Sequence, residues 1–229
     1  MEIRDSYGYR DNLNYGIIGN CQSSALIYKD SSIDWCCFPR FDSPTIFAKI
    51  IDNSIGGFFK VETVGNYNVS QEYLKNTCIL KTSFNNGFDE FHIIDYMPRY
   101  QSKKNSYYSP PEITRIVKHI RGNPKIKIIY DPRLDYSIGR TKSYVKSDFI
   151  VSISENENYE TLYLYSNANL NSIINNDVIE LESDLFFKIS YYEKLIYPKF
   201  KEILLEFNHT KEYWTNWIKK TPNFKNYNN

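Results

Sequence analysis

The chain has 229 residues, of which 41% are hydrophobic and 17% aromatic, so it can bury a sizeable core as one large all-β domain or two small ones. Its formal net charge is +1, and lysines and acids alternate along it, which gives no electrostatic support for a nucleic-acid or anionic-membrane partner. No apolar run approaches the roughly 18 residues of a membrane span. The polar N-terminus is unlike a secretory signal, so we expect a cytoplasmic protein with no membrane partner.

The four cysteines and three histidines do not indicate a metal site. No C-x-x-C spacing is present, and the adjacent Cys36 and Cys37 cannot easily chelate one metal ion together. The histidines are far apart in the sequence, which also gives no support to a Ser-His-Asp triad. We expect no metal and no cofactor.

Most of the chain has the pattern of short β-strands. Thr161–Tyr165 alternates apolar and polar-tipped residues with the period of a half-buried strand. Ten segments rich in β-branched and aromatic residues are expected as strands: Ile17–Ile18, Ala25–Tyr28, Phe58–Val61, Cys78–Phe84, Phe91–Tyr96, Ile113–Ile120, Ile126–Tyr130, Phe149–Ile153, Leu162–Tyr165 and Leu185–Tyr192.

Turn residues separate these segments at hairpin spacing, as in Asn85–Gly87, Arg121–Pro124, Asn53–Gly57 and the Asn-rich stretch Asn167–Asp177. Antiparallel strands in such number predict a large two-sheet β-sandwich over residues 1–197.

The pattern changes after Pro198, where apolar residues recur at three- and four-residue steps. This predicts an amphipathic linker helix over residues 198–220, with Pro198 in its first turn and a polar tail over 221–229. The apolar stripe has two interpretations: it packs back on the sandwich, or it meets another domain. The candidate interface residues are Phe207, Trp214 and Trp217.

A short loop between Pro39 and Pro44 is the first candidate for ligand binding. In an extended backbone, the Arg40 guanidinium and the Asp42 carboxylate point to the same side, where one donates and the other accepts hydrogen bonds from a polyhydroxyl ligand. Trp35 and Phe41 offer flat apolar faces beside them. Alternatively, Arg40 and Asp42 bond to nearby loop backbone and only hold the turn.

This segment resembles the N-terminal domain of glycoside hydrolase family 15, the family of prokaryotic glucoamylases, glucodextranases and related trehalases. The resemblance rests on three consecutive motifs, Gly19–Leu26, Ser32–Trp35 and Pro39–Pro44. Further similar segments follow in the family's order: Asp95–Pro98, Arg115 with Arg121-Gly122, Asp131–Tyr136, and Trp214 with Trp217.

The resemblance implies a supersandwich domain that, in the family, precedes an (α/α)6 barrel. The barrel carries two glutamates, a general acid and a general base, that hydrolyse α-glucosidic bonds with inversion. None of the carboxylates in this sequence corresponds to those glutamates, so the catalytic barrel is expected to be absent. In the second Pro-Arg-x-Asp segment, Pro132–Asp135, Leu134 replaces the aromatic residue of the family, which weakens the connection of this loop with sugar.

Three functions therefore compete. The first is a non-catalytic N-terminal β-domain that supports a barrel, in cis or in trans, and lends the Arg40–Asp42 loop to the rim of a site for α-glucosidic carbohydrate. The second is a stand-alone carbohydrate-binding β-sandwich. The third is an interaction domain that pairs with a separate barrel or forms a homo-oligomer through the Trp214 and Trp217 stripe. An independent catalytic pair among Asp34, Asp42 and Asp135 lacks any sequence feature that would raise one pKa.

Overall fold

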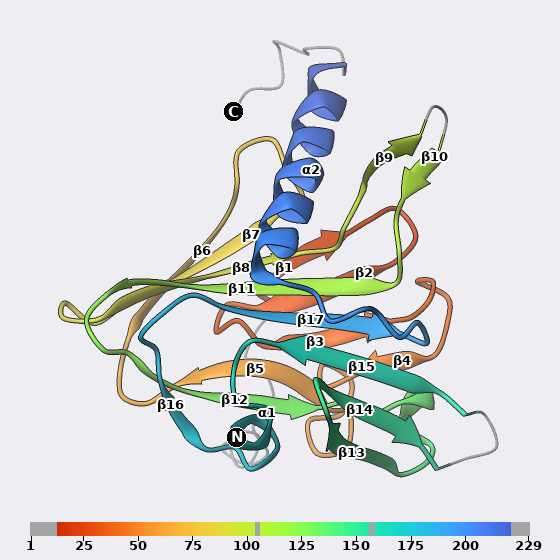
Figure 1. Cartoon of the computed structure of the whole chain (residues 1–229), viewed down its shortest axis with the longest axis horizontal. Helices are drawn as coiled ribbons and strands as arrows, with labels where there is room; N and C mark the ends of the chain where they lie inside the picture. Colours follow the sequence, from red (N-terminus) through yellow and green to blue (C-terminus); the bar gives the residue numbers. More distant parts are fainter. Residues whose placement is uncertain (1–12, 104–105, 156–158, 221–229) are drawn as a thin grey trace, which may run out of the picture.

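A computed structural model describes residues 13–103, 106–155 and 159–220 of the chain. Two large antiparallel sheets pack face to face, and a helix crosses the outer face of one of them (Figure 1). The predicted all-β sandwich with one C-terminal helix is confirmed.

The first sheet has seven strands. They are β1 (Tyr15–Gly19), β2 (Ser24–Tyr28), β3 (Ile33–Cys37), β4 (Thr45–Phe47), β5 (Phe58–Thr63), β12 (Lys125–Asp131) and β16 (Val178–Glu180). Their spatial order is β1-β2-β3-β5-β12-β16, and β4 pairs with β3. The β3–β4 register shifts between Cys36 and Cys37, a bulge that bends the strand where the candidate site begins.

The second sheet has eight strands. They are β6 (Asn68–Tyr73), β7 (Leu80–Asn85), β8 (Glu90–Tyr96), β11 (Glu112–Arg121), β13 (Thr141–Lys146), β14 (Phe149–Ser154), β15 (Thr161–Ser166) and β17 (Leu185–Tyr191). Their order is β13-β14-β15-β17-β11-β8-β7-β6. A separate hairpin pairs β9 (Tyr100–Lys103) with β10 (Ser106–Tyr108).

The main core lies between the two sheets. Alternation of buried and half-buried residues directs Phe59 and Val61 of β5 inward, and Leu162 and Leu164 of β15 enter the same core cluster from the opposite sheet. Aromatic rings cross the interface, as where Phe59 meets Phe187 edge to face with centroids 5.7 Å apart.

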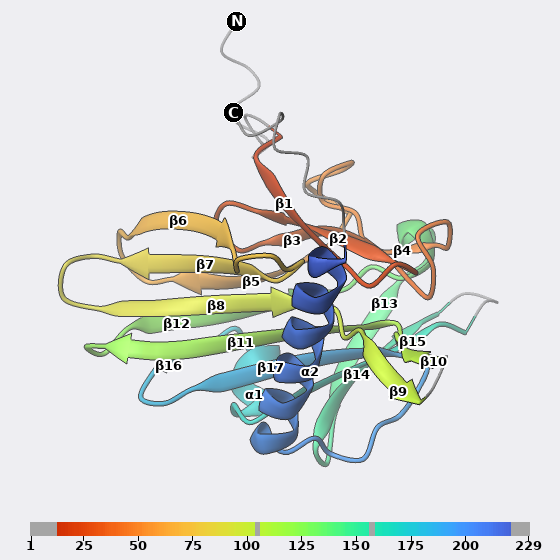
Figure 2. The same cartoon turned by 90° about the horizontal axis from the view of Figure 1, so that it is seen from above.

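The second sheet also buries its outer face. A cluster that includes Tyr96, Ile116 and Phe186 packs under Ile203 of helix α2 (Phe200–Lys219). Figure 2 shows α2 running across β17, β11 and β8, with the β9–β10 hairpin beside it. Two short elements complete the fold, α1 (Leu170–Ile174) and the 3-10 turn η2 (Asp135–Ser137).

All ten predicted strand segments overlap strands, whereas seven strands were not predicted: β3, β4, β6, β9, β10, β13 and β16. Most of these are only three or four residues long or polar, as in the almost fully exposed β6, so they carry little apolar alternation. The Asn-rich stretch expected as a turn contains α1, capped by the Asn169 side chain.

Helix α2 begins at Phe200, two residues beyond Pro198, with Lys199 as N-cap. The predicted polar tail 221–229 lies outside the described residues. Within the described ranges, no helix is both long and apolar enough to cross a membrane.

Candidate functional site

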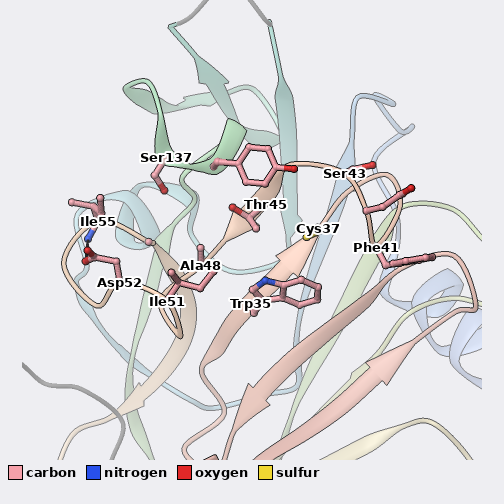
Figure 3. A pocket seen from close by; sticks show the side chains of 13 residues that line it. Trp35, Cys37, Phe41, Ser43, Thr45, Ala48, Ile51, Asp52, Ile55 and Ser137 are labelled. Carbon is pink, nitrogen blue, oxygen red and sulfur yellow. Dashed lines mark hydrogen bonds between the residues drawn. The ribbon is translucent and has the colours of Figure 1, made fainter.

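An open cleft of about 600 Å³ lies at one end of the sandwich, and we call it the Trp35 cleft. Figure 3 shows Trp35 and Thr45 between two walls, with Phe41 and Ser43 on one side and Ile51, Asp52 and Ile55 on the other. The 13 lining residues are Trp35, Cys37, Phe41, Asp42, Ser43, Thr45, Ala48, Ile51, Asp52, Ile55, Gly56, Tyr136 and Ser137.

The loop between β3 and β4 forms the first wall. Arg40 and Asp42 face the same side and bind each other through two hydrogen bonds, Nε to Oδ1 and Nη2 to Oδ2, both 3.1 Å long. Their side chains are 66% and 54% exposed, so this pair lies on the surface. The Ser43 N–H donates to the Arg40 carbonyl at 3.1 Å, which closes the turn. Trp35, Phe41 and Asp42 therefore line the cleft, and Arg40 lies beside it.

The loop from Ala48 to Gly56 forms the second wall. The Asp52 carboxylate accepts hydrogen bonds from the Ser54 hydroxyl at 2.6 Å and from the Ser54 and Ile55 N–H groups at 2.8 and 3.1 Å. These bonds lower the pKa of Asp52. A Cβ at Gly56 would lie 2.3 Å from the Ala48 carbonyl oxygen, so this closely folded loop requires glycine there.

The turn η2 closes the cleft from a third direction. Asp135, Tyr136 and Ser137 all have positive φ, at 51°, 56° and 60°. Left-handed backbone costs a non-glycine residue about 1–2 kcal/mol, so three in succession need external support. That support is Glu160, whose carboxylate accepts from the Asp135 N–H at 3.0 Å and the Tyr191 hydroxyl at 3.1 Å. Burial raises the pKa of Glu160.

Two hydroxyls of the cleft are buried without a hydrogen-bond partner among the residues that the structure describes. They are Thr45 Oγ1, on β4, and Ser137 Oγ, on η2. A buried polar group without a partner costs about 1–3 kcal/mol, and native proteins contain few of them. The cleft therefore combines aromatic faces with two hydroxyls that have hydrogen-bonding capacity to spare.

Asn20, Asp34, Asp95 and Arg115, four other motif residues, build the interior. Asn20 folds the turn after β1: its Oδ1 accepts from the Gln22 and Ser23 N–H groups at 3.1 and 3.0 Å, and its Nδ2 donates to the Pro110 carbonyl at 2.8 Å. The Asn20 side chain thus stabilises the backbone of the turn after β1, and both of its polar atoms already have partners.

Asp95 and Arg115 form a fully buried ion pair within the second sheet, with Nε–Oδ1 and Nη2–Oδ2 distances of 2.7 and 3.2 Å. The same guanidinium donates to the Ser31 carbonyl at 2.6 Å and to the Phe59 carbonyl at 3.3 Å. Ser31 lies between β2 and β3 and Phe59 lies on β5, so both carbonyls belong to the first sheet. We call these four groups the Arg115 clamp. It connects the two sheets through charge-assisted hydrogen bonds.

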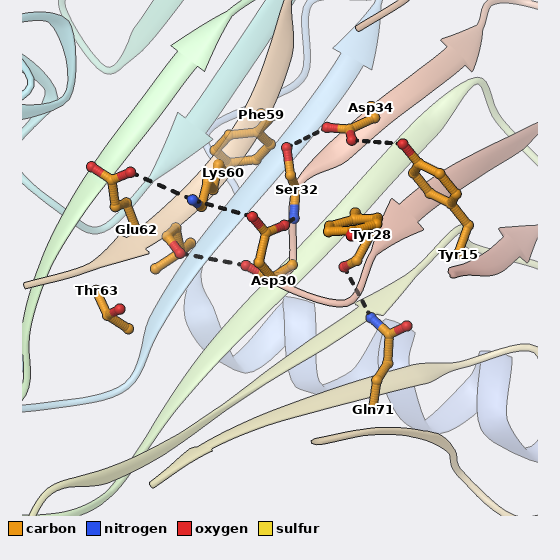
Figure 4. A network of polar contacts seen from close by, with 12 residues as sticks. Tyr15, Tyr28, Asp30, Ser32, Asp34, Phe59, Lys60, Glu62, Thr63 and Gln71 are labelled. Carbon is orange, nitrogen blue, oxygen red and sulfur yellow. Dashed lines mark hydrogen bonds and ion pairs between the residues drawn. The ribbon is translucent and has the colours of Figure 1, made fainter. Parts of the chain in front are cut away.

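Asp34 lies on the same strand as Trp35 but points inward. Figure 4 shows Tyr15 and Ser32 donating their hydroxyls to its carboxylate, the first at 2.9 Å. Beside this network, Lys60 bridges Asp30 and Glu62 at 3.2 and 3.4 Å. Asp34 is fully buried, so it belongs to the core of the domain.

The three candidate interface residues of α2 lie in different surroundings. Phe207 packs against Tyr96, with ring centroids 5.8 Å apart, on the sandwich. Trp214 and Trp217 meet edge to face at 6.1 Å, and Trp217 is 49% exposed. The first half of α2 therefore packs back on the sheet, whereas in the second half Trp217 is half exposed and the Trp214 indole nitrogen is buried.

Two basic residues anchor α2. Lys188, buried in β17, contacts Glu206 of the helix at 2.7 Å and Glu112 of β11 at 2.6 Å. Arg99 lies between the Tyr107 and Tyr213 rings and donates to the Tyr213 hydroxyl at 2.8 Å. A second groove, of about 610 Å³, runs between the helix and the β9–β10 hairpin, lined by residues that include Tyr107, Tyr213 and Trp217.

The sequence pointed to Trp35, Phe41 and Asp42 but not to Thr45, Tyr136, Ser137 or Glu160. No sequence pattern predicts that three consecutive residues other than glycine adopt the left-handed backbone conformation. The hydrogen bond between the Asp135 N–H and Glu160 joins positions 25 residues apart, which only the folded chain brings together. In the described part of the chain, no group of three or more His, Cys, Asp or Glu side chains could hold a metal ion.

The fold and the cleft define a β-sandwich domain with an aromatic surface cleft, behind which two hydroxyls are buried. Residues 13–168 match the family described as trehalase-like, N-terminal. The chain belongs to this family of trehalase-like N-terminal domains.

Proteins similar to the chain agree with this assignment. A trehalase of Thermoplasma volcanium is 32% identical over 145 residues, which cover 62% of this chain and 22% of that protein. A trehalase of Thermoplasma acidophilum is 29% identical over 198 residues, covering 84% of this chain and 33% of that protein. Trehalase 2 of Sulfolobus acidocaldarius is 37% identical over 86 residues, 38% of this chain and 14% of that protein. The matches thus span a third or less of these relatives, and no solved structure matches the chain.

Proposed function

We propose that the chain is the non-catalytic N-terminal β-domain of an inverting α-glucoside hydrolase of the trehalase or glucoamylase type, in glycoside hydrolase family 15. Its role is to support a catalytic barrel, in cis or in trans, and to lend the Arg40–Asp42 loop to the rim of the active site. The observation that carries the proposal is the match of residues 13–168 to the trehalase-like N-terminal family. Cytoplasmic location stays a prediction.

The acids of the Trp35 cleft support a non-catalytic role. An inverting hydrolase needs a carboxylic acid and a carboxylate on the order of 6.5–9.5 Å apart, and the acid must keep its proton near neutral pH. Asp42 is engaged with Arg40, and Asp52 is engaged as a backbone cap that lowers its pKa. Glu160, whose pKa is raised, is buried and already accepts two hydrogen bonds.

The surface position of Arg40 and Asp42 supports the role at the rim. Both side chains are more than half exposed, and they already face the same direction. Such a pair presents donors and acceptors together, which is the arrangement that a polyhydroxyl substrate requires. The aromatic second half of α2 supports contact with a barrel or with a second copy of the chain.

Glucose release tests the proposal. The purified chain, incubated with trehalose and with maltose, is expected to release no more glucose than a heat-denatured control. A chimaera in which the chain replaces the matching segment of the Thermoplasma volcanium trehalase is expected to hydrolyse trehalose. In that chimaera, Arg40→Ala is expected to lower kcat/KM by about tenfold, as for the loss of one charge-assisted hydrogen bond.

Robust glucose release by the chain alone would contradict the non-catalytic role. An active chimaera in which Arg40→Ala leaves kcat/KM unchanged would contradict the role at the rim. Arg133→Ala is the matched control, because Arg133 makes the same two-bonded contact with Asp131, at 2.9 and 3.1 Å, and is not part of that loop.

A further inference from the structure

We propose that the Trp35 cleft is itself a carbohydrate-binding site, which takes one pyranose ring of an α-glucoside in the chain alone. In this site Trp35 lies against the apolar face of the sugar, and the Thr45 and Ser137 hydroxyls, which are buried in the ligand-free chain, turn to bind its hydroxyl groups. The choice of α-glucosides among pyranose sugars rests on the proposed function. The site itself rests on the structure of the cleft.

The shape of the cleft fits a small ligand. Its volume of about 600 Å³ lies within the roughly 300–1,000 Å³ of known ligand sites. Three segments converge on it: the β3–β4 loop, the Ala48–Gly56 loop that follows β4, and η2, which lies far along the chain (Figure 3). A molecule that enters the cleft therefore contacts all three.

The unpartnered hydroxyls determine the polarity of the ligand. Thr45 is 5% exposed, and its Oγ1 has no hydrogen-bond partner among the described residues, as is also true of Ser137 Oγ. A hydroxyl both donates and accepts, so it pairs equally well with the hydroxyl of a sugar. The Asp42 and Asp52 carboxylates also line the cleft, and their negative charge disfavours an anionic ligand. A neutral polyhydroxyl compound satisfies both conditions.

The aromatic side chains determine the shape of the ligand. Trp35, Phe41 and Tyr136 line the same cleft, and Tyr136 and Phe41 are 52% and 65% exposed. Aromatic rings combine a large apolar face with, in Trp and Tyr, a polar edge. A pyranose ring has the same two-sided character, with C–H groups on its faces and hydroxyls around its edge. A linear polyol such as glycerol has no face to pack on Trp35.

The backbone of η2 is consistent with a site formed in advance of binding. Its three left-handed residues persist because the surroundings fix them, and strained backbone of this kind concentrates at ligand sites. Glu160 and Tyr191 hold the turn from below, so Ser137 keeps its position without a ligand.

Titration by two-dimensional NMR tests the inference, with the chain alone and glucose, trehalose, maltose and glycerol as probes. We expect the resonances of the cleft to shift saturably with the three sugars, with a Kd on the order of 1 mM, as for a single small ring. Glycerol is expected to cause no saturable shift. Thr45→Val, which keeps the side-chain shape, is expected to weaken sugar binding by about tenfold. Trp35→Leu is expected to weaken it at least as much.

Two control variants lie outside the cleft. Thr215→Val removes a hydroxyl of α2 that donates to the Lys211 carbonyl, and Phe88→Leu removes an exposed aromatic ring between β7 and β8. Both are expected to bind sugar within about twofold of the parent. A melting temperature for each variant establishes that it is folded.

Three outcomes would overturn the inference: no saturable shift with any sugar at concentrations on the order of 100 mM, glycerol binding as well as glucose, or binding unchanged in both Thr45→Val and Trp35→Leu. These results are separate from the test of the proposed function. A chain that is inactive and binds no sugar contradicts the cleft site alone. A chain that hydrolyses trehalose contradicts the non-catalytic role alone.

Discussion

The Arg115 clamp and the Trp35 cleft are two regions of this sandwich whose polar groups have opposite surroundings. In the clamp, the Asp95 carboxylate and the Arg115 guanidinium are fully buried, paired with each other and bonded onward to backbone carbonyls. In the cleft, the Arg40–Asp42 pair is exposed and two nearby hydroxyls have no partner. Where every polar group has a hydrogen-bond partner, as in the clamp, the motif residues stabilise the fold. Where buried hydroxyls have no partner among the described residues, as in the cleft, they indicate a ligand site.

Strand β3 joins the two regions. Its burial pattern leaves Trp35 half-exposed between fully buried neighbours, because alternate side chains of a strand point to opposite faces. Asp34 therefore enters the interior network with Tyr15 and Ser32, while Trp35 reaches the cleft. One short motif thus contributes to both the core and the candidate site.

The largest expected effect comes from breaking the clamp. Arg115→Met leaves the Asp95 carboxylate buried without its cation, so the free energy of unfolding is expected to fall by about 3–5 kcal/mol. Urea denaturation followed by tryptophan fluorescence measures this. The double variant Arg115→Met with Asp95→Leu is expected to recover much of the loss. A single-variant loss under about 1 kcal/mol would show that the clamp does not hold the sheets together.

The next effect concerns pH and the support of η2. Burial raises the pKa of Glu160 above its usual 4.5, so the folded chain binds its proton more tightly than the unfolded chain does. The stability that comes from this proton is present below pH 4.5 and is lost as the pH rises through the raised pKa. Glu160→Gln is expected to remove this loss, giving a flatter curve of unfolding free energy as the pH rises above 4.5. The exposed Glu182→Gln is the control, and an equal flattening in both variants would refute the assignment.

A smaller effect with the opposite sign is expected in the cleft. Thr45→Val removes a buried hydroxyl that has no partner, and so the free energy of unfolding of the ligand-free chain is expected to rise by about 1 kcal/mol. Thermal unfolding measures it. Ser23→Ala provides the contrast, because the Ser23 hydroxyl donates to the Cys37 carbonyl at 2.5 Å and its loss is expected to destabilise. Destabilisation by Thr45→Val would mean that the hydroxyl is satisfied in solution.

The smallest effect is expected at the exposed pair. Arg40→Ala removes an ion pair whose members are both more than half exposed, so the free energy of unfolding is expected to change by less than about 1 kcal/mol. The same urea titration measures it beside Arg115→Met. Comparable losses at the two arginines would remove the distinction between the clamp and the cleft.

The sequence predicted the architecture better than the site. Apolar alternation located the ten strands that form most of both sheets, since each has one face in the core. It did not reveal strands such as β6, whose pairing with β7 depends on backbone hydrogen bonds more than on an apolar face.

The site was predictable only where its residues are consecutive. Arg40 and Asp42 share a side because they are two positions apart in a short loop, and Trp35 stands next to that loop in the sequence. Tyr136 and Ser137 reach the cleft through a left-handed turn that has no glycine, and they depend on Glu160 from a different segment. Such convergence is a property of the tertiary structure.

Arg99 has one further consequence. Its guanidinium donates to the Asn20 carbonyl at 2.7 Å and to the Tyr213 hydroxyl at 2.8 Å, and its backbone N–H donates to the Thr210 hydroxyl. The turn after the first strand and the last helix, almost 200 residues apart along the chain, thus share one side chain. Their amide protons should exchange with solvent as a single cooperative unit, so that helix and turn open together.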